Sequence, residues 1–306
     1  MRVFLLFAIF ALCVSLFYPL PAKKLRILEF NRFHKEITFV SYPFPTHSDE
    51  LMTVFRISIL SWINVSKNSQ VILFIDEKFD FNQLKIKSER IELISISDER
   101  IPDIFSKAKS LCKTKYICFI QPFVVVDKWW YDYSLNTIIN IENETSVLTG
   151  YQYDVDYKID TLKKVNDSSL LQSIKIALLE SSVRCRLPTG SDYFIFPIIN
   201  LKQSYIDTLP PYHFGGSYWD LFIIKTYSQK YNFFSMRNKA PVYSLRLKNQ
   251  DHELIKENEK MYDYTNILKH YQIAENKMIG ELNTLTNESK LYKQIPCESY
   301  REYPGF

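Results

Sequence analysis

Residues 71–77 have the sequence Val-Ile-Leu-Phe-Ile-Asp-Glu, in which five apolar residues are followed at once by two acids. A short continuous apolar run without alternation is typical of a strand buried on both faces, as strands are in a parallel sheet covered by helices. Similar runs, rich in strand-forming residues and bounded by turn signals, predict further strands at residues 36–42, 91–96, 116–120 and 147–151.

Helical patterns separate these strands. Ser48, Asp49 and Glu50 are typical of a helix start, because serine caps the first turn and acids favour its positive end. Apolar residues then recur at helical spacing as far as Trp62. Further helices are predicted to begin at Pro102 and to cover residues 129–139, 168–183 and 218–231. Strands that alternate with helices predict an α/β fold, with a Rossmann-like and mostly parallel sheet in a single domain.

The ends of the predicted strands indicate where a ligand binds. In parallel sheets, ligand sites lie beyond the carboxyl ends of the strands, a side of the sheet that we call the carboxyl edge. The residues expected there are 41–42, 76–77, 121–123 and 151–152.

The composition excludes several classes of function. The chain has 306 residues, with 38 Lys and Arg against 34 Asp and Glu, and its net charge of +4 is too small and too dispersed to predict nucleic-acid binding. It has only 6 glycines, and neither phosphate-binding motif, GxGxxG or GxxxxGK[ST], occurs in it. The serine-hydrolase motif GxSxG and the zinc-protease motif HExxH are also missing from the sequence.

The N-terminus predicts entry into the secretory pathway. Residues 3–20 are almost all apolar, with Arg2 before them and a basic cluster after them. We expect residues 1–22 to be an uncleaved signal-anchor, because Leu20 is a poor third-last residue for a cleavage site that ends at Ala22. The chain is then expected to be a single-pass protein of the Golgi or endoplasmic reticulum membrane with a luminal domain. The alternative is a cleaved signal peptide and a secreted protein.

Beyond this segment we predict a basic stem at residues 23–35, the folded domain at residues 36–253 and a polar, helical C-terminal extension at residues 254–306. Four Asn-x-Ser/Thr sequons give weak further support for the secretory pathway, at Asn64, Asn143, Asn166 and Asn287. Four cysteines follow the apolar segment, and they either form two disulfides or remain buried thiols: Cys112, Cys118, Cys185 and Cys297.

A set of short motifs gives the chain a family resemblance. They are SILSW at 58–62, VILFIDE at 71–77, GYQYDVD at 150–156, DYFIF at 192–196, PYHFG at 211–215 with WD at 219–220, and NQDHE at 249–253. In this order they resemble motifs of the nucleotide-diphospho-sugar transferase superfamily, which comprises glycosyltransferases of the A-type fold. No single motif is specific, so the resemblance rests on the ordered set, which covers roughly residues 36 to 255.

The resemblance implies a glycosyltransferase that moves a sugar from a nucleotide-sugar donor to a glycan or glycoprotein acceptor. It implies that Asp220, in the first turn of a predicted helix, is the catalytic base that takes the proton of the acceptor hydroxyl. Candidate residues for binding the nucleotide sugar are Asp76, Gln121, Asp192 and His252. Each of the acids also has a plain structural explanation, as a turn residue or a helix-start acid.

The sequence departs from the family where a metal ion is expected. The family has an acidic motif after the strand that ends at Ile120, whereas this chain has Gln121, Pro122 and Phe123. Mn²⁺ and Mg²⁺ prefer carboxylate oxygens, so the usual ligands are missing and we assign no metal-binding residues. The alternative hypothesis is therefore a catalytically inactive relative that acts as a binding or scaffolding partner, because losing the metal removes the main stabiliser of transition-state charge.

Overall fold

The computed structural model describes residues 34–46, 48–97, 100–141, 146–155, 157, 159–163, 165, 183–185, 191–209, 211–214, 219–220, 223, 227, 231–236 and 242–245. The chain divides after Lys35 into two units, and the contacts discussed below all lie within Glu36–Phe306. The strands are β1 (His34–Ser41), β2 (Gln70–Ile75), β3 (Ile91–Ser95), β4 (Thr114–Ile120), β5 (Val124–Val125), β6 (Ser146–Val155), β7 (Val183–Cys185), β8 (Ser191–Pro197), β9 (Asn232–Ser235) and β10 (Val242–Ser244). The helices are α3 (Asp49–Asn64), α4 (Ile101–Leu111), α5 (Lys128–Asn140), α6 (Ile159–Lys163) and α8 (Gln203–Ile206), with short 3-10 turns at Phe81–Leu84 and Ile198–Asn200.

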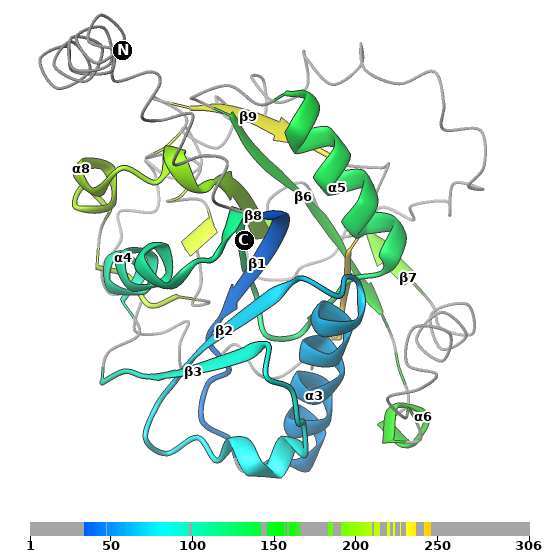
Figure 1. Cartoon of the computed structure of the whole chain (residues 1–306). Coiled ribbons are helices and arrows are strands. Elements are labelled where there is room, and N and C mark those ends of the chain that lie inside the picture. The colour runs from blue at the N-terminus through cyan, green and yellow to red at the C-terminus, as the bar shows by residue number, and fades with distance from the viewer. Residues whose placement is uncertain are drawn as a thin grey trace, which may run out of the picture. The chain divides into compact units, whose positions relative to one another are not determined.

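The central strands form a mostly parallel sheet in the order β3-β2-β1-β4-β8-β6 (Figure 1). β1 pairs with β2, and β2 with β3, in parallel. Side-chain bonds from Thr38 to Thr114 and from Ser41 to the carbonyl of Ile120 advance in the same direction along both strands, so β4 is parallel to β1. β8 is antiparallel to both β4 and β6, which leaves β6 running in the same direction as β4.

The long strand β6 changes partners along its length. Its first half pairs with β8 and β9, and its second half with β7 and β10. The register against β8 shifts between Thr149 and Tyr151, on either side of Gly150. A side chain at position 150 would place its Cβ 2.3 Å from the hydroxyl oxygen of Tyr193, so only glycine fits at this position.

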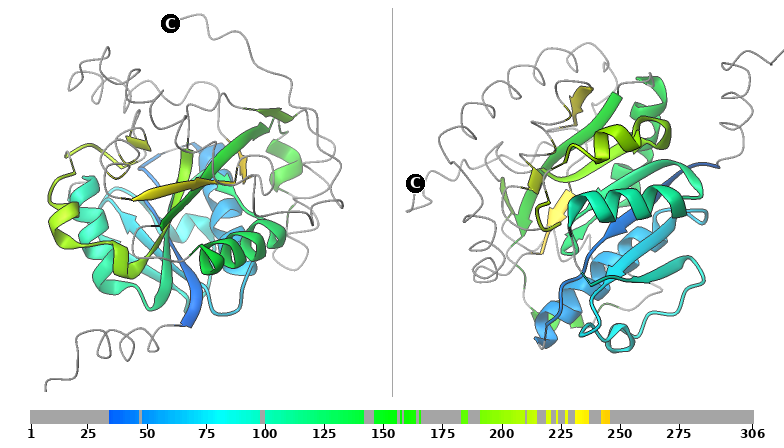
Figure 2. Two further views of the ribbon diagram at one scale, coloured as in Figure 1. Left: turned by 90° about the horizontal axis from the view of Figure 1, so that it is seen from above. Right: turned by 90° about the vertical axis from the view of Figure 1, so that its left-hand side faces the viewer.

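Helices cover both faces of the sheet (Figure 2). On one face, Phe39 of β1 stacks on Trp62 of α3 with ring centroids 5.9 Å apart and lies 6.1 Å from Trp130 of α5. On the other face, Phe119 of β4 stacks on Phe105 of α4 at 3.6 Å. We call these the α3 face and the α4 face. Because successive residues of a strand point to opposite faces, both faces of the central strands are apolar, as the unbroken hydrophobic runs predicted.

The structure confirms the predicted α/β fold and corrects several details of it. The strand after position 190, β8, is antiparallel to its neighbours. The sequence does not indicate this direction, because a strand buried on both faces has no alternation from which it can be inferred. Val124–Val125 forms a short strand of its own that pairs with β10, and the strand predicted at 147–151 extends to Val155. Strand β9 follows directly on the predicted helix 218–231, of which the described positions 219, 220, 223 and 227 are helical. Most of the helix predicted at 168–183 lies outside the described residues, although Val183 belongs to β7.

In the described part of the chain, no helix is long and apolar enough to cross a membrane. The apolar segment at residues 3–20, the stem and the C-terminal extension lie outside the described residues. The signal-anchor, the stem and the extension therefore stay predictions.

Candidate active site at the carboxyl edge

Gln121 and Asp192 lie side by side at the carboxyl edge. The register of β4 and β8 pairs Ile120 with Tyr193, and one residue further the amide of Gln121 donates to the carbonyl of Asp192 at 3.0 Å. Residues directly opposite each other in an antiparallel pair have side chains on the same face. Ile120 and Tyr193 belong to the core on the α3 face, so Gln121 and Asp192 lie on the α4 face. The structure thus brings together two residues that were predicted from separate parts of the sequence.

An aromatic cluster on the α4 face supports this pair. It consists of Phe119, Phe194, Phe214 and Trp219. Phe119 and Phe194 are opposite each other, two residues further into the sheet than Gln121 and Asp192. Phe214 contacts Phe119 at a centroid distance of 6.3 Å, and Trp219 lies 4.6 Å from Phe214 and 5.4 Å from Phe194. These contacts hold two segments of the later chain against the middle of the sheet.

The aromatic cluster also places His213 and Asp220, which are the chain neighbours of Phe214 and Trp219. We call Gln121, Asp192, His213 and Asp220 the edge cluster. Their exposed fractions are 3%, 5%, 7% and 8%. Burying a polar side chain is costly unless it is hydrogen-bonded, so these four buried polar residues are candidates for a functional site.

The start of α4 fixes the loop that carries His213. The amide of Ile101 donates to the carbonyl of Tyr212 at 2.8 Å, and Nη1 of Arg100 donates to the carbonyl of Pro211 at 2.7 Å. Arg100 and His213 also form an isolated antiparallel bridge. Since α4 follows β3 in the chain, it begins on the carboxyl side of the sheet, and His213 is held there with it.

Sequence reasoning missed His213 as a candidate. The residue is part of the quoted PYHFG motif, but the family motif leaves this position open to any residue, and a single histidine in a loop gives no periodic signal. Only the structure shows that His213 is buried beside Phe214, which makes it a candidate.

Asp76 lies at the end of β2, where its carboxylate supports a turn. Its Oδ1 accepts a hydrogen bond from the amide of Lys78 at 2.7 Å, and its carbonyl accepts one from the amide of Phe79 at 3.0 Å. This is the turn-forming role that a strand-end aspartate often has. Asp76 is separated from β4 by β1, so it is not part of the edge cluster. His252 lies outside the described residues.

The loop at residues 121–126, where the family has its metal motif, is tightly built into the fold. Phe123 is buried in the core on the α3 face. The indole Nε1 of Trp62 donates to the carbonyl of Val124 at 2.9 Å, and the amide of Val126 donates to Oγ of Ser61 at 3.2 Å. An amide side chain, a proline and a buried phenyl ring do not fit Mn²⁺ or Mg²⁺. Within the described ranges, no group of three His, Cys, Asp or Glu residues is arranged to hold a metal ion.

Two of the four cysteines that follow the apolar segment are free, buried thiols. Burial raises the pKa of both Cys112 and Cys118, so both stay protonated at neutral pH. Neither takes part in a disulfide, and inert buried thiols of this kind have a packing role.

No protein-family model and no curated protein matches this sequence. Comparison with solved structures finds TarS residues 1–349 from S. aureus at 12% identity and a TM-score of 0.44, covering 68% of this chain and 60% of that one. TarS in complex with UDP-GlcNAc aligns at 11% identity and a TM-score of 0.47, over 78% of this chain and 66% of that one. HddC from Yersinia pseudotuberculosis aligns at 11% identity and a TM-score of 0.40, over 74% of this chain and 96% of that one.

This chain therefore spans about 60% of the length of the first TarS structure. One of these neighbours, TarS, was crystallised with UDP-GlcNAc.

Proposed function

We propose that the chain is a glycosyltransferase of the secretory pathway that transfers a sugar from a nucleotide-sugar donor to a glycan or glycoprotein acceptor. The observation that carries this proposal is the edge cluster. Gln121 and Asp192 are buried at the carboxyl edge of a mostly parallel sheet, which is where α/β folds bind their ligands, and the chain neighbours of His213 and Asp220 pack on the same face.

Asp220 is proposed as the general base. A carboxylate can take the proton of an acceptor hydroxyl as that oxygen attacks the anomeric carbon of the donor sugar. Asp220 is buried at 8% exposure and follows Trp219, whose ring is fixed between Phe194 and Phe214. A base that is held in place by a packed neighbour keeps its orientation, which positional catalysis requires.

Asp192 and Gln121 are proposed to bind the nucleotide sugar. A carboxylate accepts hydrogen bonds from sugar hydroxyls, and a side-chain amide both donates and accepts them. Because the two residues are opposite each other on adjacent strands, they present these groups as one rigid pair.

Arg100 and His213 are proposed to balance the charge of the leaving nucleoside diphosphate. That negative charge must be stabilised in the transition state, and where the family has its acidic metal motif this chain has Gln121, Pro122 and Phe123. A guanidinium carries a positive charge, and a ring N–H of an imidazole can donate a hydrogen bond to a phosphate oxygen. The bridge between these two residues brings both groups to the start of α4.

The test is transfer and donor hydrolysis by the full-length purified chain, with UDP- and GDP-sugars in turn, together with calorimetric titration of the free nucleotides. We expect a nucleotide to bind and its sugar donor to turn over, with or without Mn²⁺. Absence of both binding and turnover with every common nucleotide sugar would overturn the proposal.

One observation favours a second candidate, an inactive relative that binds glycans or scaffolds active enzymes. Phe123 fills the core at the position of the family's metal motif, so this chain has lost a part that active relatives use. Binding of a nucleotide without any hydrolysis or transfer, unchanged by the substitution Asp220→Asn, would support the inactive relative.

A further inference from the structure

The C-terminal end of α3 carries the sequon Asn64-Val65-Ser66, and its three residues have different environments. Asn64 is the last residue of the helix and is exposed. Val65 is buried at 1% exposure, and its amide donates to the carbonyl of Ser61. The helix therefore ends with the asparagine side chain in solvent and the following residue anchored in the core.

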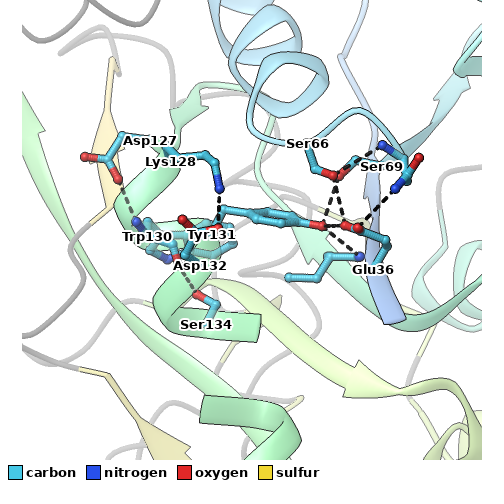
Figure 3. A network of polar contacts seen from close by, with 11 residues as sticks. Glu36, Ser66, Ser69, Asp127, Lys128, Trp130, Tyr131, Asp132 and Ser134 are labelled. Carbon is cyan, nitrogen blue, oxygen red and sulfur yellow. Dashed lines mark hydrogen bonds and ion pairs between the residues drawn. The ribbon is translucent and has the colours of Figure 1, made fainter. Parts of the chain in front are cut away.

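Ser66 belongs to a network of polar contacts that includes Glu36 and Tyr131 (Figure 3). Glu36 lies near the start of β1, so this network is at the opposite end of the sheet from the edge cluster. Oγ of Ser66 donates to Oε2 of Glu36 at 2.9 Å, and the hydroxyl of Tyr131 donates to the same carboxylate oxygen. Asn68 contributes a weaker bond from Nδ2 to Oε1 of Glu36 at 3.4 Å. In the folded chain the hydroxyl of Ser66 is therefore engaged by Glu36 of β1.

Arg90 holds the backbone of the same segment. Its Nη1 donates to the carbonyl of Ile63 at 2.8 Å and also to the carbonyl of Ser66. Ile63 lies in the last turn of α3 and Ser66 follows the helix, and carbonyls at the end of a helix have no partner within the helix itself. The backbone on both sides of Asn64 is thus fixed, and a large group on the Asn64 side chain extends into solvent without breaking these contacts.

We propose that Asn64 is N-glycosylated. The Asn64 amide nitrogen forms a bond to the anomeric carbon of an oligosaccharide carried on a lipid diphosphate, the bond from that carbon to the diphosphate breaks, and the amide nitrogen gives up one proton. This proposal rests on entry into the secretory pathway and is independent of the edge cluster. The acceptor motif is read by its asparagine amide and its serine hydroxyl. In the folded chain the Ser66 hydroxyl is hydrogen-bonded to Glu36, so the oligosaccharide is transferred to Asn64 before α3 packs on β1.

The location makes the modification compatible with the proposed site. α3 begins at Asp49, after the carboxyl end of β1, and runs back so that Asn64 precedes the amino end of β2. A glycan at Asn64 therefore lies at the end of the domain that is remote from Gln121 and Asp192.

The experiment is expression of the full-length chain in a eukaryotic secretory host, followed by removal of N-glycans by glycosidase in ¹⁸O-labelled water and mass spectrometry of the peptide that contains Asn64. We expect most copies of this peptide to carry the ¹⁸O-labelled aspartate that marks a former glycan. Asn64→Gln and Ser66→Ala should abolish the mark, and Ser66→Thr, which keeps the sequon hydroxyl, should retain it.

Asn64→Gln also provides the folding control, because it leaves the Ser66–Glu36 bond intact. Its thermal midpoint after glycan removal should equal that of the parent chain. Recovery of the Asn64 peptide without label would overturn the proposal, whether or not the sequons at Asn143, Asn166 and Asn287 are labelled. Transferase activity is measured separately, so its absence does not affect this result.

Discussion

The substitution Gly150→Ala should destabilise the chain through a steric conflict at one defined atom. The new Cβ would lie 2.3 Å from the hydroxyl oxygen of Tyr193 and 3.1 Å from its Cζ, both closer than side chains tolerate. Tyr193 has no exposed surface, and its ring meets Trp130 edge-on at a centroid distance of 5.1 Å. The tyrosine therefore has little room to move.

Overpacking in a closed core typically costs about 1–3 kcal/mol, and we expect Gly150→Ala to fall in the upper half of that range. With a urea dependence of about 3 kcal/mol per molar, the unfolding midpoint should drop by roughly 0.5–1 M. Tyr193 directly follows Asp192, so the same displacement should disturb the edge cluster and weaken nucleotide binding.

The assay is urea unfolding of the parent chain, the variants Gly150→Ala and Tyr193→Phe, and the double variant. Tyr193→Phe removes the oxygen that the new Cβ meets and leaves its next contact at 3.1 Å. The double variant should therefore be more stable than the sum of the single effects predicts, by about 1 kcal/mol or more, since neighbouring substitutions couple in this way. Strict additivity of the two substitutions would refute the steric explanation.

Three further predictions concern the candidate site and the polar contacts of Tyr131 with Glu36. Asp220→Asn should lower kcat for transfer by about 10²-fold or more, because general-base catalysis contributes about 10²–10⁴-fold. The nucleotide affinity, measured by calorimetry, should stay nearly unchanged. Removal of divalent metal with EDTA should change the turnover less than about twofold, whereas a metal-bound diphosphate would make the loss much larger. Burial, together with the hydrogen bond to Glu36, raises the pKa of Tyr131 from 10.0 to about 12. As the pH rises, the unfolded chain therefore loses this proton before the folded chain does. The contribution of Tyr131 to the free energy of unfolding is complete below pH 10 and is lost between pH 10 and 12. Tyr131→Phe should flatten the fall in unfolding free energy over that window, and an equally steep fall would contradict this explanation.

The strand and helix positions were predictable because their apolar runs are long and clearly bounded. The run at 71–77 lies on β2, and the signal at Ser48 is an actual cap, in which Oγ of Ser48 accepts from the amide of Leu51. Directions and pairings were harder to predict. Residues 193–196 of β8 and 71–75 of β2 are both unbroken apolar runs, yet β8 is antiparallel and β2 is parallel to its neighbours. Burial on both faces removes the alternation from which the direction of a strand could be inferred.

The candidate site was predictable only where a strand ends. Gln121 follows β4 and Asp192 opens β8, so the topology brings them together once the strands are known. Asp76 follows a strand equally well, but its carboxylate supports a local turn, a use that sequence does not separate from ligand binding. His213 depends on contacts with the start of α4, more than 100 positions earlier in the chain, and no local pattern encodes such a contact.

The abundance of aromatic residues explains how this edge is organised without the usual devices. The chain has 22 Phe and 21 Tyr but only 6 Gly, so it has little material for glycine-rich loops that hold phosphates through backbone amides. Instead, Phe119, Phe194, Phe214 and Trp219 pack into one cluster, and each is adjacent to or two residues from a member of the edge cluster. Ring packing is rigid and excludes water, which strengthens every electrostatic interaction beside it. Under the proposed function, such a site would rely on protein charges in place of a metal ion, and the precision of its polar geometry would depend on the aromatic packing beneath it.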